Sequence, residues 1–223
     1  MRSVVLSVTL AALIILYGVP AGAQITNGSF ESGSQNPGNG WIVLNGGSPV
    51  IDGWNIDQGS IDYIGGWWPA SDGLRSIDLS GLSAGGVSQS IPTIPGSRYE
   101  VTFDMSGNPD GGPLLKLLTV TADGAQGTTF SYDVAANGNT RSNMKWVQQR
   151  YTFVAEDDWT LLAFTSQAAT FYGPTLDNVN VERLEGICHR NNGKKGSKTL
   201  YVDPAAYPAH LAHGDTAGPC ESE

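Results

Sequence analysis

The chain has 223 residues and carries 21 acidic against 12 basic side chains, a formal net charge of −9 at pH 7. This balance leaves no electropositive surface for phosphates, so we expect no nucleic acid partner. Both cysteines and all three histidines lie in residues 188–223, and residues 24–183 contain neither type. A Ser-His-Asp triad, a thiol nucleophile and a histidine-bound metal are therefore excluded from this larger part, unless the C-terminal residues reach back into it.

The first 23 residues predict a secretory signal peptide. Arg2 precedes an apolar run over residues 4–16, and the small residues Ala21 and Ala23 suit signal peptidase. The run is short for a membrane-spanning helix, so we expect cleavage and no membrane span. We place the mature N-terminus at Gln24 and expect an exported protein, secreted or associated with the cell surface. The remaining chain is long enough for one all-β domain and an appendage.

Residues 24–183 predict a jelly-roll β-sandwich. Short alternating runs are separated by Gly, Asn, Asp and Pro, and no helical period of useful length is present. The run at residues 161–164 is apolar at every position, which predicts a central strand buried on both faces. We expect strands near residues 50–55, 60–64, 75–79, 86–91, 98–105, 114–122, 127–134, 145–154, 159–165 and 175–183. The expected core residues are Tyr99, Val101, Phe103, Tyr151, Phe153, Leu161 and Val179.

Residues 53–80 concentrate the candidate recognition chemistry. Aromatic rings can cover the apolar face of a sugar while carboxylates and amides take its hydroxyls. Tryptophan on a strand is more often a core residue, but Trp67 and Trp68 are adjacent and cannot both enter one core. Asp78 is at an outward position of an alternating run. The candidate ligand-binding residues are Trp54, Tyr63, Trp67, Trp68 and Asp78, with Asn108 and Asp110 from a glycine-rich loop.

Two other functions are compatible with these residues. A glycoside hydrolase or lyase could use two carboxylates, drawn from Asp57, Asp62, Asp72 and Asp78. Acids are common in Asp-Gly turns, however, and none of the four lies in a motif that demands a raised pKa. The third function is a structural matrix subunit that associates with itself through exposed tryptophans.

Residues 184–223 predict a small module with its own chemistry. Residues 199–202 predict a strand, and a short helix is expected from Asp203-Pro204 to Gly214. Export places the two thiols in an oxidising compartment, which favours a disulfide between Cys188 and Cys220 and no catalytic metal. The alternative is a zinc site, for which the available ligands are Cys188, His189, His210, His213 and Cys220.

Eight phrases occur in a characteristic order: NGSFE (27–31), GW (53–54), SIDYI (60–64), DGLRSIDL (72–79), SQS (88–90), PGSRY (95–99), GNP (107–109) and YGPTLDNV (172–179). Over roughly residues 27–181 this set resembles the bacterial choice-of-anchor C family, whose relatives are plant cell-wall proteins with galactose-binding-like domains. The resemblance implies a secreted jelly-roll sandwich that associates with polysaccharide. The C-terminal part departs from that family and is similar to a short Cys/His module found on exported bacterial proteins.

The resemblance also implies a cation. Many carbohydrate-binding modules with this type of sandwich carry a structural calcium where the first and last strands meet, and the similar positions here are Asn27, Glu31 and Asp177. The alternative is that Glu31 and Asp177 cap turns. No organic cofactor is expected. We therefore expect a non-catalytic carbohydrate-binding or matrix-associated protein whose partner is a polysaccharide.

Overall fold

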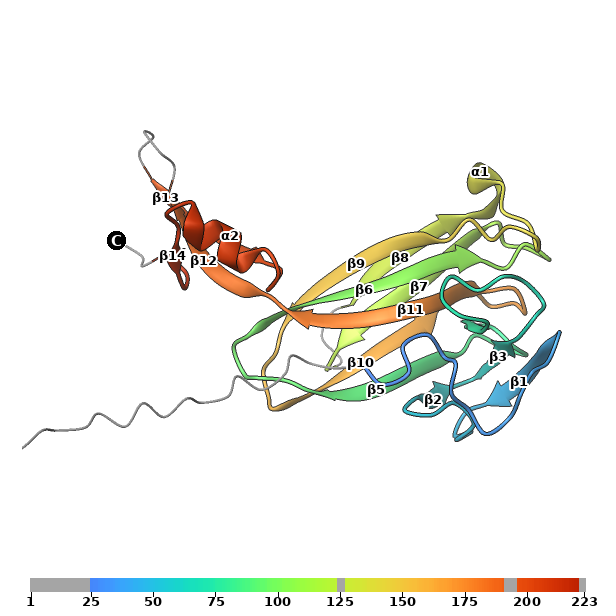
Figure 1. Ribbon diagram of the computed structural model, residues 1–223. Coiled ribbons are helices and arrows are strands. Elements are labelled where there is room, and N and C mark those ends of the chain that lie inside the picture. The colour runs from blue at the N-terminus through green and yellow to red at the C-terminus, as the bar shows by residue number, and fades with distance from the viewer. Residues whose placement is uncertain (1–24, 124–126, 191–195, 221–223) are drawn as a thin grey trace, which may run out of the picture.

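The computed structural model describes residues 25–123, 127–190 and 196–220, and the expected signal peptide lies outside these ranges. Two antiparallel sheets face each other and form a jelly-roll sandwich (Figure 1). The six-stranded sheet has the order β1 (Trp41–Asn45), β3 (Ser60–Ile64), β4 (Ser76–Asp78), β11 (Pro174–Arg183), β6 (Arg98–Gly107) and β9 (Val147–Val154). The five-stranded sheet has the order β2 (Asn55–Gln58), β5 (Gly86–Pro92), β10 (Trp159–Ser166), β7 (Leu115–Ala122) and β8 (Thr128–Asp133).

The core lies between the two sheets and follows the alternation of the strands. Tyr99, Val101 and Phe103 on β6 point inward and are buried, because successive side chains of a strand point to opposite faces. The Phe103 ring meets the rings of Phe130 on β8 and Phe164 on β10 edge-on, with centroids 5.2 and 5.3 Å away. Phe103 therefore joins the six-stranded sheet to the five-stranded one.

The expected all-β sandwich is confirmed, and most expected strands are present. Strand β1 was not expected, because residues 41–44 are apolar at every position and hide the alternation. The strand expected over residues 50–55 is wrong, since β2 begins only at Asn55. A single helical turn, α1 (Val134–Asn137), was also not expected, and the Asp133 side chain caps it.

One expected core residue is wrong. Leu161 is 45% exposed, whereas the other six expected core residues are buried. Strand β10 does lie centrally, between β5 and β7. Within β10, Leu162 and Phe164 point inward and are buried. The alternate residues Leu161 and Trp159 therefore point to the outer face of the five-stranded sheet. An apolar run therefore predicted the strand correctly but not the burial of both faces.

The C-terminal residues form a separate three-stranded sheet beyond the end of β11 (Figure 1). Its order is β13 (Ser197–Val202), β12 (Glu185–Arg190) and β14 (Thr216–Ala217), and α2 (Tyr207–Ala212) packs beside it. The helix starts three residues later than expected, at Tyr207 instead of Pro204, because Asp203 caps the preceding turn by accepting the N–H of Ala205. No helix in the described ranges is long and apolar enough to cross a membrane.

The disulfide between Cys188 and Cys220 is confirmed, and it closes the C-terminal module with Cα atoms 4.6 Å apart. A zinc site that uses both thiolates is therefore wrong, since neither sulfur is free to bind a cation. His213 is exposed at the C-terminal end of α2, where Gly214 follows with a φ of +97°. This positive φ explains why the helix ends where the sequence predicted.

Candidate functional site

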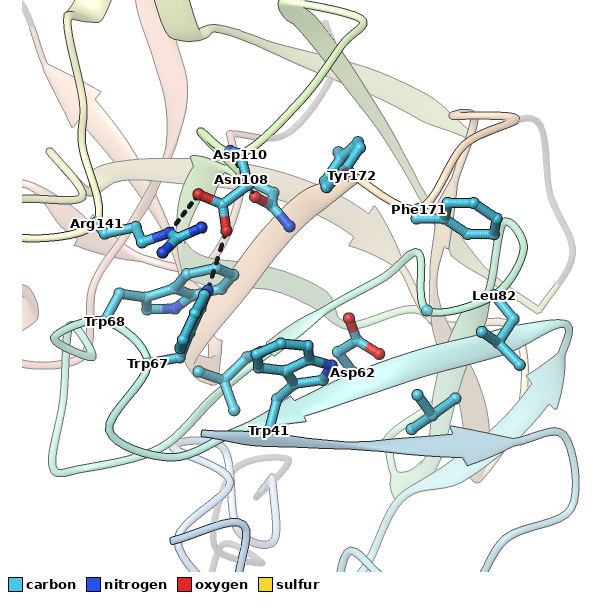
Figure 2. A pocket seen from close by; sticks show the side chains of 13 residues that line it. Trp41, Asp62, Trp67, Trp68, Leu82, Asn108, Asp110, Arg141, Phe171 and Tyr172 are labelled. Atoms are coloured by element: carbon cyan, nitrogen blue, oxygen red, sulfur yellow. Dashed lines mark hydrogen bonds and ion pairs between the residues drawn. The ribbon is translucent and has the colours of Figure 1, made fainter. Parts of the chain in front are cut away.

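A cavity of about 370 Å³ lies on the outer face of the six-stranded sheet, the face that does not pack against the second sheet (Figure 2). Strands β1 and β3 form its floor, because their register pairs Trp41 with Ile64 and Val43 with Asp62. Loops from five parts of the chain form the rim. The lining residues are Trp41, Val43, Asp62, Ile64, Trp67, Trp68, Gly81, Leu82, Asn108, Asp110, Arg141, Phe171 and Tyr172.

Two tryptophans form one aromatic side of the cavity. Trp41 is 45% exposed, and its ring lies 4.7 Å from that of Trp67 at an interplanar angle of 60°. The Trp67 indole N–H donates to Oδ2 of Asp110 at 3.0 Å, and Arg141 lies over the Trp67 ring at 4.1 Å. Arg141 also donates from Nε to Oδ1 of Asp110 at 2.5 Å (Figure 2). The orientation of Trp67 is therefore fixed, while the Trp41 ring offers an accessible apolar surface.

Asp62 is the polar group of the floor. The residue is only 9% exposed, and Oδ1 has no hydrogen-bond partner among the described residues. Burial raises the pKa of Asp62 to about 7. A buried oxygen without a partner is unfavourable by roughly 1–3 kcal/mol, so this carboxyl group is retained on the cavity floor at a cost in stability.

Asp78 lies opposite Asp62 in the β3–β4 pair, but it is completely buried. Its carboxylate accepts hydrogen bonds from Nδ2 of Asn108 at 2.7 Å and from the backbone N–H groups of Ser80 and Gly173. Burial raises the pKa of Asp78 to about 8, although the hydrogen bond from Asn108 opposes this shift. Asp78 therefore connects the loops of the rim to the sheet and does not reach the cavity.

Lys116 on β7 is a buried cation beneath the rim. Its Nζ donates to the carbonyl oxygens of Gly111 and Tyr172, at 2.8 and 2.7 Å. Burial lowers the pKa of Lys116 to about 8, and the nearby Asp78 carboxylate opposes the shift. Because these two carbonyls belong to different loops, Lys116 fixes both loops that carry the upper side of the cavity.

Three of the proposed ligand-binding residues are in the wrong place for contact with a ligand. Trp54 and Tyr63 belong to the main core, and Asp78 is covered by the loops of the rim. The Trp54 indole N–H donates to the carbonyl of Asn27, and the Tyr63 hydroxyl donates to that of Phe30. Trp54 and Tyr63 therefore follow the general tendency of large aromatic side chains to be buried, and they do not contribute to the cavity.

The other four proposed residues line the cavity together: Trp67, Trp68, Asn108 and Asp110. Neither adjacent tryptophan enters the main core. Trp68 is buried in a second, small cluster with Ile64 and Met144, and Trp67 packs against that cluster while partly exposed. The alternation of a strand does not apply to these two residues, because they lie in the turn after β3, and both rings contact the same small cluster.

Several cavity residues were not predicted, among them Trp41, Arg141 and Tyr172, and Asp62 was a candidate catalytic acid but not one of the candidate ligand-binding residues. The strand of Trp41 was not recognised, and Arg141 and Tyr172 lie in loops far along the chain. The alternation of residues 60–64 was a usable signal for Asp62. Because Tyr63 points to the core, Asp62 must point to the opposite face.

Of the four candidate catalytic acids, only Asp62 lines the cavity. Asp57 is exposed on β2 of the other sheet, Asp72 lies exposed in a loop, and Asp78 is buried. The second carboxylate of the cavity is Asp110, which is engaged by Arg141 and Trp67. The cavity therefore does not present two free carboxylates to a glycosidic bond.

The residues proposed for calcium make hydrogen bonds with the backbone. Glu31 accepts the N–H groups of Leu74 and Arg75, and Asp177 accepts those of Ser71 and Asp72. Both carboxylates thus cap the loop between β3 and β4, as the turn-capping alternative expected. The Asn27 side chain instead bonds Ser32 and Asp52. Calcium binding at these positions stays a prediction, since a carboxylate that accepts N–H bonds retains further lone pairs.

The fold and the cavity define a class: an antiparallel β-sandwich whose outer face carries a recess lined by aromatic rings and carboxylates. The chain belongs to the family described as "Protein of unknown function (DUF642)", whose model matches residues 23–182. This match ends before the C-terminal module. It distinguishes neither the choice-of-anchor C group nor the Cys/His module, and both resemblances stay predictions.

The chain is also similar to halomucin of Haloquadratum walsbyi, with 28% identity over 227 residues that cover 96% of this chain and 2% of halomucin. Among solved structures it is similar to the CBM22-1 xylan-binding domain of Xyn10C from Paenibacillus barcinonensis. That match has 21% identity, covers 73% of this chain and 96% of that one, and has a TM-score of 0.41. A family 35 carbohydrate-binding module from Clostridium thermocellum matches with 12% identity, coverage of 63% and 90%, and a TM-score of 0.39.

Proposed function

We propose that this protein is exported, binds a polysaccharide in the cavity of the six-stranded sheet and does not cleave it. The observation that carries the proposal is that the Asp62 carboxyl group and the exposed Trp41 ring line the same recess. Trp41 and Asp62 are diagonal neighbours across the β1–β3 pair, so one sugar ring can reach both. The indole would cover the apolar face of the sugar while the Asp62 carboxyl group bonds a hydroxyl.

The rigidity of the cavity supports binding. Lys116, Asp78 and Asp110 fix the loops of the rim through hydrogen bonds to other parts of the protein. A site that is ordered before the ligand arrives loses less conformational entropy when it binds. The size of the cavity suits one or two sugar units of a longer chain, because small-molecule sites typically have about 300–1,000 Å³.

The main experiment measures retention of the mature protein on a panel of insoluble plant and bacterial polysaccharides, with calcium present and absent. Trp41→Ala should lower retention at least about tenfold, which corresponds to about 1.4 kcal/mol. Trp159→Ala is the matched control, since Trp159 is 60% exposed on the other sheet. Failure of the folded protein to be retained on any polysaccharide, or equal effects of both substitutions, would contradict the proposal.

The same material separates the two alternative functions. Release of reducing sugar that is lost in Asp62→Asn would identify a hydrolase, for which the raised pKa of Asp62 is the supporting observation. Oligomers that form with rising concentration and disappear in Trp41→Ala would identify a self-associating subunit. Export is tested independently, because the N-terminal sequence of the secreted protein should begin at Gln24.

A further inference from the structure

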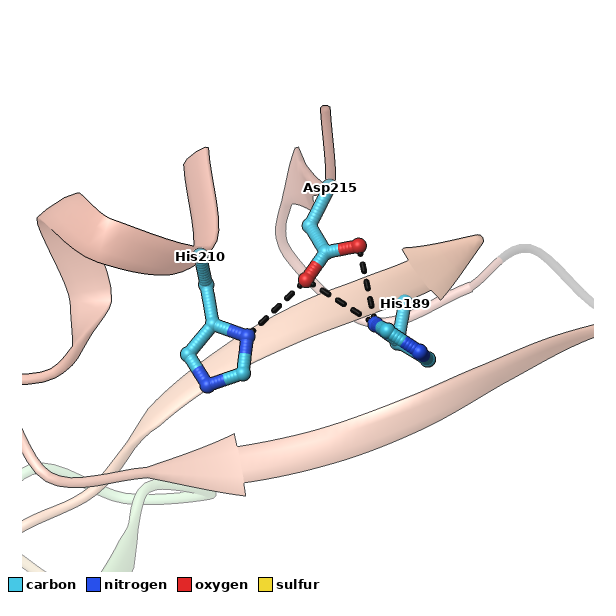
Figure 3. Close-up of side chains that lie close together, drawn as sticks. All are labelled: His189, His210 and Asp215. Carbon is cyan, nitrogen blue, oxygen red and sulfur yellow. Dashed lines mark hydrogen bonds and ion pairs between the residues drawn. The ribbon is translucent and has the colours of Figure 1, made fainter. Parts of the chain in front are cut away.

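The C-terminal module brings together three side chains that the cavity does not involve. Strands β12 and β14 are antiparallel and pair Cys188 with Thr216, so the next opposing positions are His189 and Asp215. Helix α2 lies against β12 and adds His210 from a third segment. Figure 3 shows the two imidazole rings turned toward the Asp215 carboxylate from opposite sides.

The three side chains are close together, and both imidazole rings face the Asp215 carboxylate. Nδ1 of His189 lies 3.0 and 3.1 Å from the two carboxylate oxygens of Asp215, and Nδ1 of His210 lies 2.9 Å from Oδ2. The two rings are nearly perpendicular, with centroids 6.5 Å apart. The Asp215 side chain is almost completely buried, whereas both histidines remain partly accessible from solvent.

We propose that His189, His210 and Asp215 bind one divalent transition-metal ion of the zinc type. One ligand atom from each residue lies within 4.8 Å of the others. Adjacent ligands in a tetrahedral zinc site with bonds of about 2.0–2.1 Å are about 3.3 Å apart. The nitrogen–oxygen distances of 2.9–3.1 Å must therefore widen slightly, and the two imidazole nitrogens must approach each other where they are further apart than this. Neutral imidazole nitrogens and a carboxylate are ligands that zinc prefers. The ion replaces the two imidazole protons that otherwise point at Asp215.

In this module the ion would attach helix α2 to the three-stranded sheet. No residue of α2 is buried, so the helix has little apolar contact with the sheet. Cys188 and His189 are neighbours on β12 and point to opposite faces of the strand. The disulfide therefore crosslinks one face of β12 to the chain end, and the metal crosslinks the other face to α2. Small modules without a sufficient core are commonly held by such crosslinks.

The opposing interpretation is that the two imidazoles serve only as hydrogen-bond donors to Asp215. Both interpretations explain why the side chains converge, and metal affinity distinguishes them. The experiment uses the mature, disulfide-bonded protein without a histidine tag, stripped with a chelator and titrated with zinc sulfate against a chromogenic chelator. We expect one zinc ion per chain.

Three variants remove one ligand each: His189→Ala, His210→Ala and Asp215→Asn. Each should lower zinc affinity at least about tenfold, since even the loss of an outer-shell partner has an effect of this size. His213→Ala is the matched control, because His213 lies three residues from His210 but is exposed at the helix end. This control should bind zinc as the wild type does.

A cobalt-substituted sample gives a second measurement that needs no variant. Bound Co²⁺ should show visible absorption bands without a thiolate charge-transfer band, because both sulfurs are in the disulfide. Absence of zinc binding by the wild-type protein would overturn the proposal even if a variant failed to fold. Zinc binding that survives all three substitutions, or that is lost equally in His213→Ala, would overturn it as well.

Discussion

The sandwich and the C-terminal module are held together by different means. The sandwich buries a continuous apolar cluster contributed by both sheets, with rings such as Phe103 and Phe164 in contact across its centre. Among the described residues of the module, only Ile187 and Cys188 are buried apolar side chains. The module relies instead on a disulfide and on the polar contacts of Asp215. Because buried surface grows with chain length, a segment of this size cannot stabilise itself by a core.

The largest expected effect tests the dependence of the sandwich on its core. Phe103→Ala should lower the free energy of unfolding of the sandwich by about 3–5 kcal/mol, because it removes a buried ring that contacts both sheets. Denaturant unfolding followed by tryptophan fluorescence measures this change. A shift below about 1 kcal/mol would show that the two sheets do not depend on this contact.

The second prediction tests the dependence of the module on its covalent bond. Replacement of both Cys188 and Cys220 by serine should destabilise the module by about 3–4 kcal/mol, since the bond closes a loop between residues separated by 32 positions. Hydrogen exchange should become fast in β12 and β14 and stay slow in β6. Equal loss of protection in both regions would show that the two parts unfold together.

The third prediction concerns pH and applies to the sandwich alone. Burial raises the pKa values of Asp62 and Asp177 to about 7 and that of Asp78 to about 8. The folded protein therefore holds protons that the unfolded chain releases near pH 4, and stability must fall as pH rises from about 4 to 8. Lys116 contributes above this pH range. Its pKa is lowered to about 8, so above pH 8 the folded protein loses a proton that the unfolded chain still holds, and stability rises again with pH.

Thermal unfolding between pH 4 and pH 8 measures this dependence. The melting temperature of the sandwich should fall across the range, and Asp62→Asn should reduce the slope because it removes one titrating group. A melting temperature that rises with pH over this range would contradict the assigned burial of the three carboxyl groups.

The smallest expected effect compares two adjacent leucines on β10. Leu161→Ala should change stability by less than about 0.5 kcal/mol, since this side chain points to the outer face. Leu162→Ala removes a completely buried side chain and should destabilise the sandwich by about 2–5 kcal/mol. Similar values for the two variants would show that the register of β10 is wrong.

The sequence predicted the fold well where alternation was visible. Residues 98–105 alternate between apolar and polar, and β6 and the inward direction of Phe103 followed from that pattern. The pattern failed where every position was apolar. In residues 41–44 and 161–164 the sequence does not show which alternate positions face the core. For this reason β1 was not predicted and Leu161 was assigned to the wrong face.

The candidate site was harder to predict than the fold. Trp67 and Asp110 were identified from composition and loop position, but composition does not tell which aromatic residue is exposed. Trp54 and Tyr63 carry the same chemistry as Trp41 and lie in the core. The side of the sheet on which a ring lies depends on register, and register is fixed by contacts between distant strands. Asp215 was not predicted for the same reason, because its position opposite His189 depends on the register between β12 and β14.

The connection between the two parts of the molecule has a mechanical consequence. Only Leu184 separates β11 from β12, and β11 lies inside the six-stranded sheet between β4 and β6. A pull on the C-terminal module is therefore transmitted along the axis of a ten-residue inner strand. Hydrogen bonds between antiparallel strands are perpendicular to the strands, so this force loads many of them in shear at once instead of opening them one by one. A protein tethered by this module would resist extraction by tension better than one attached through an edge strand.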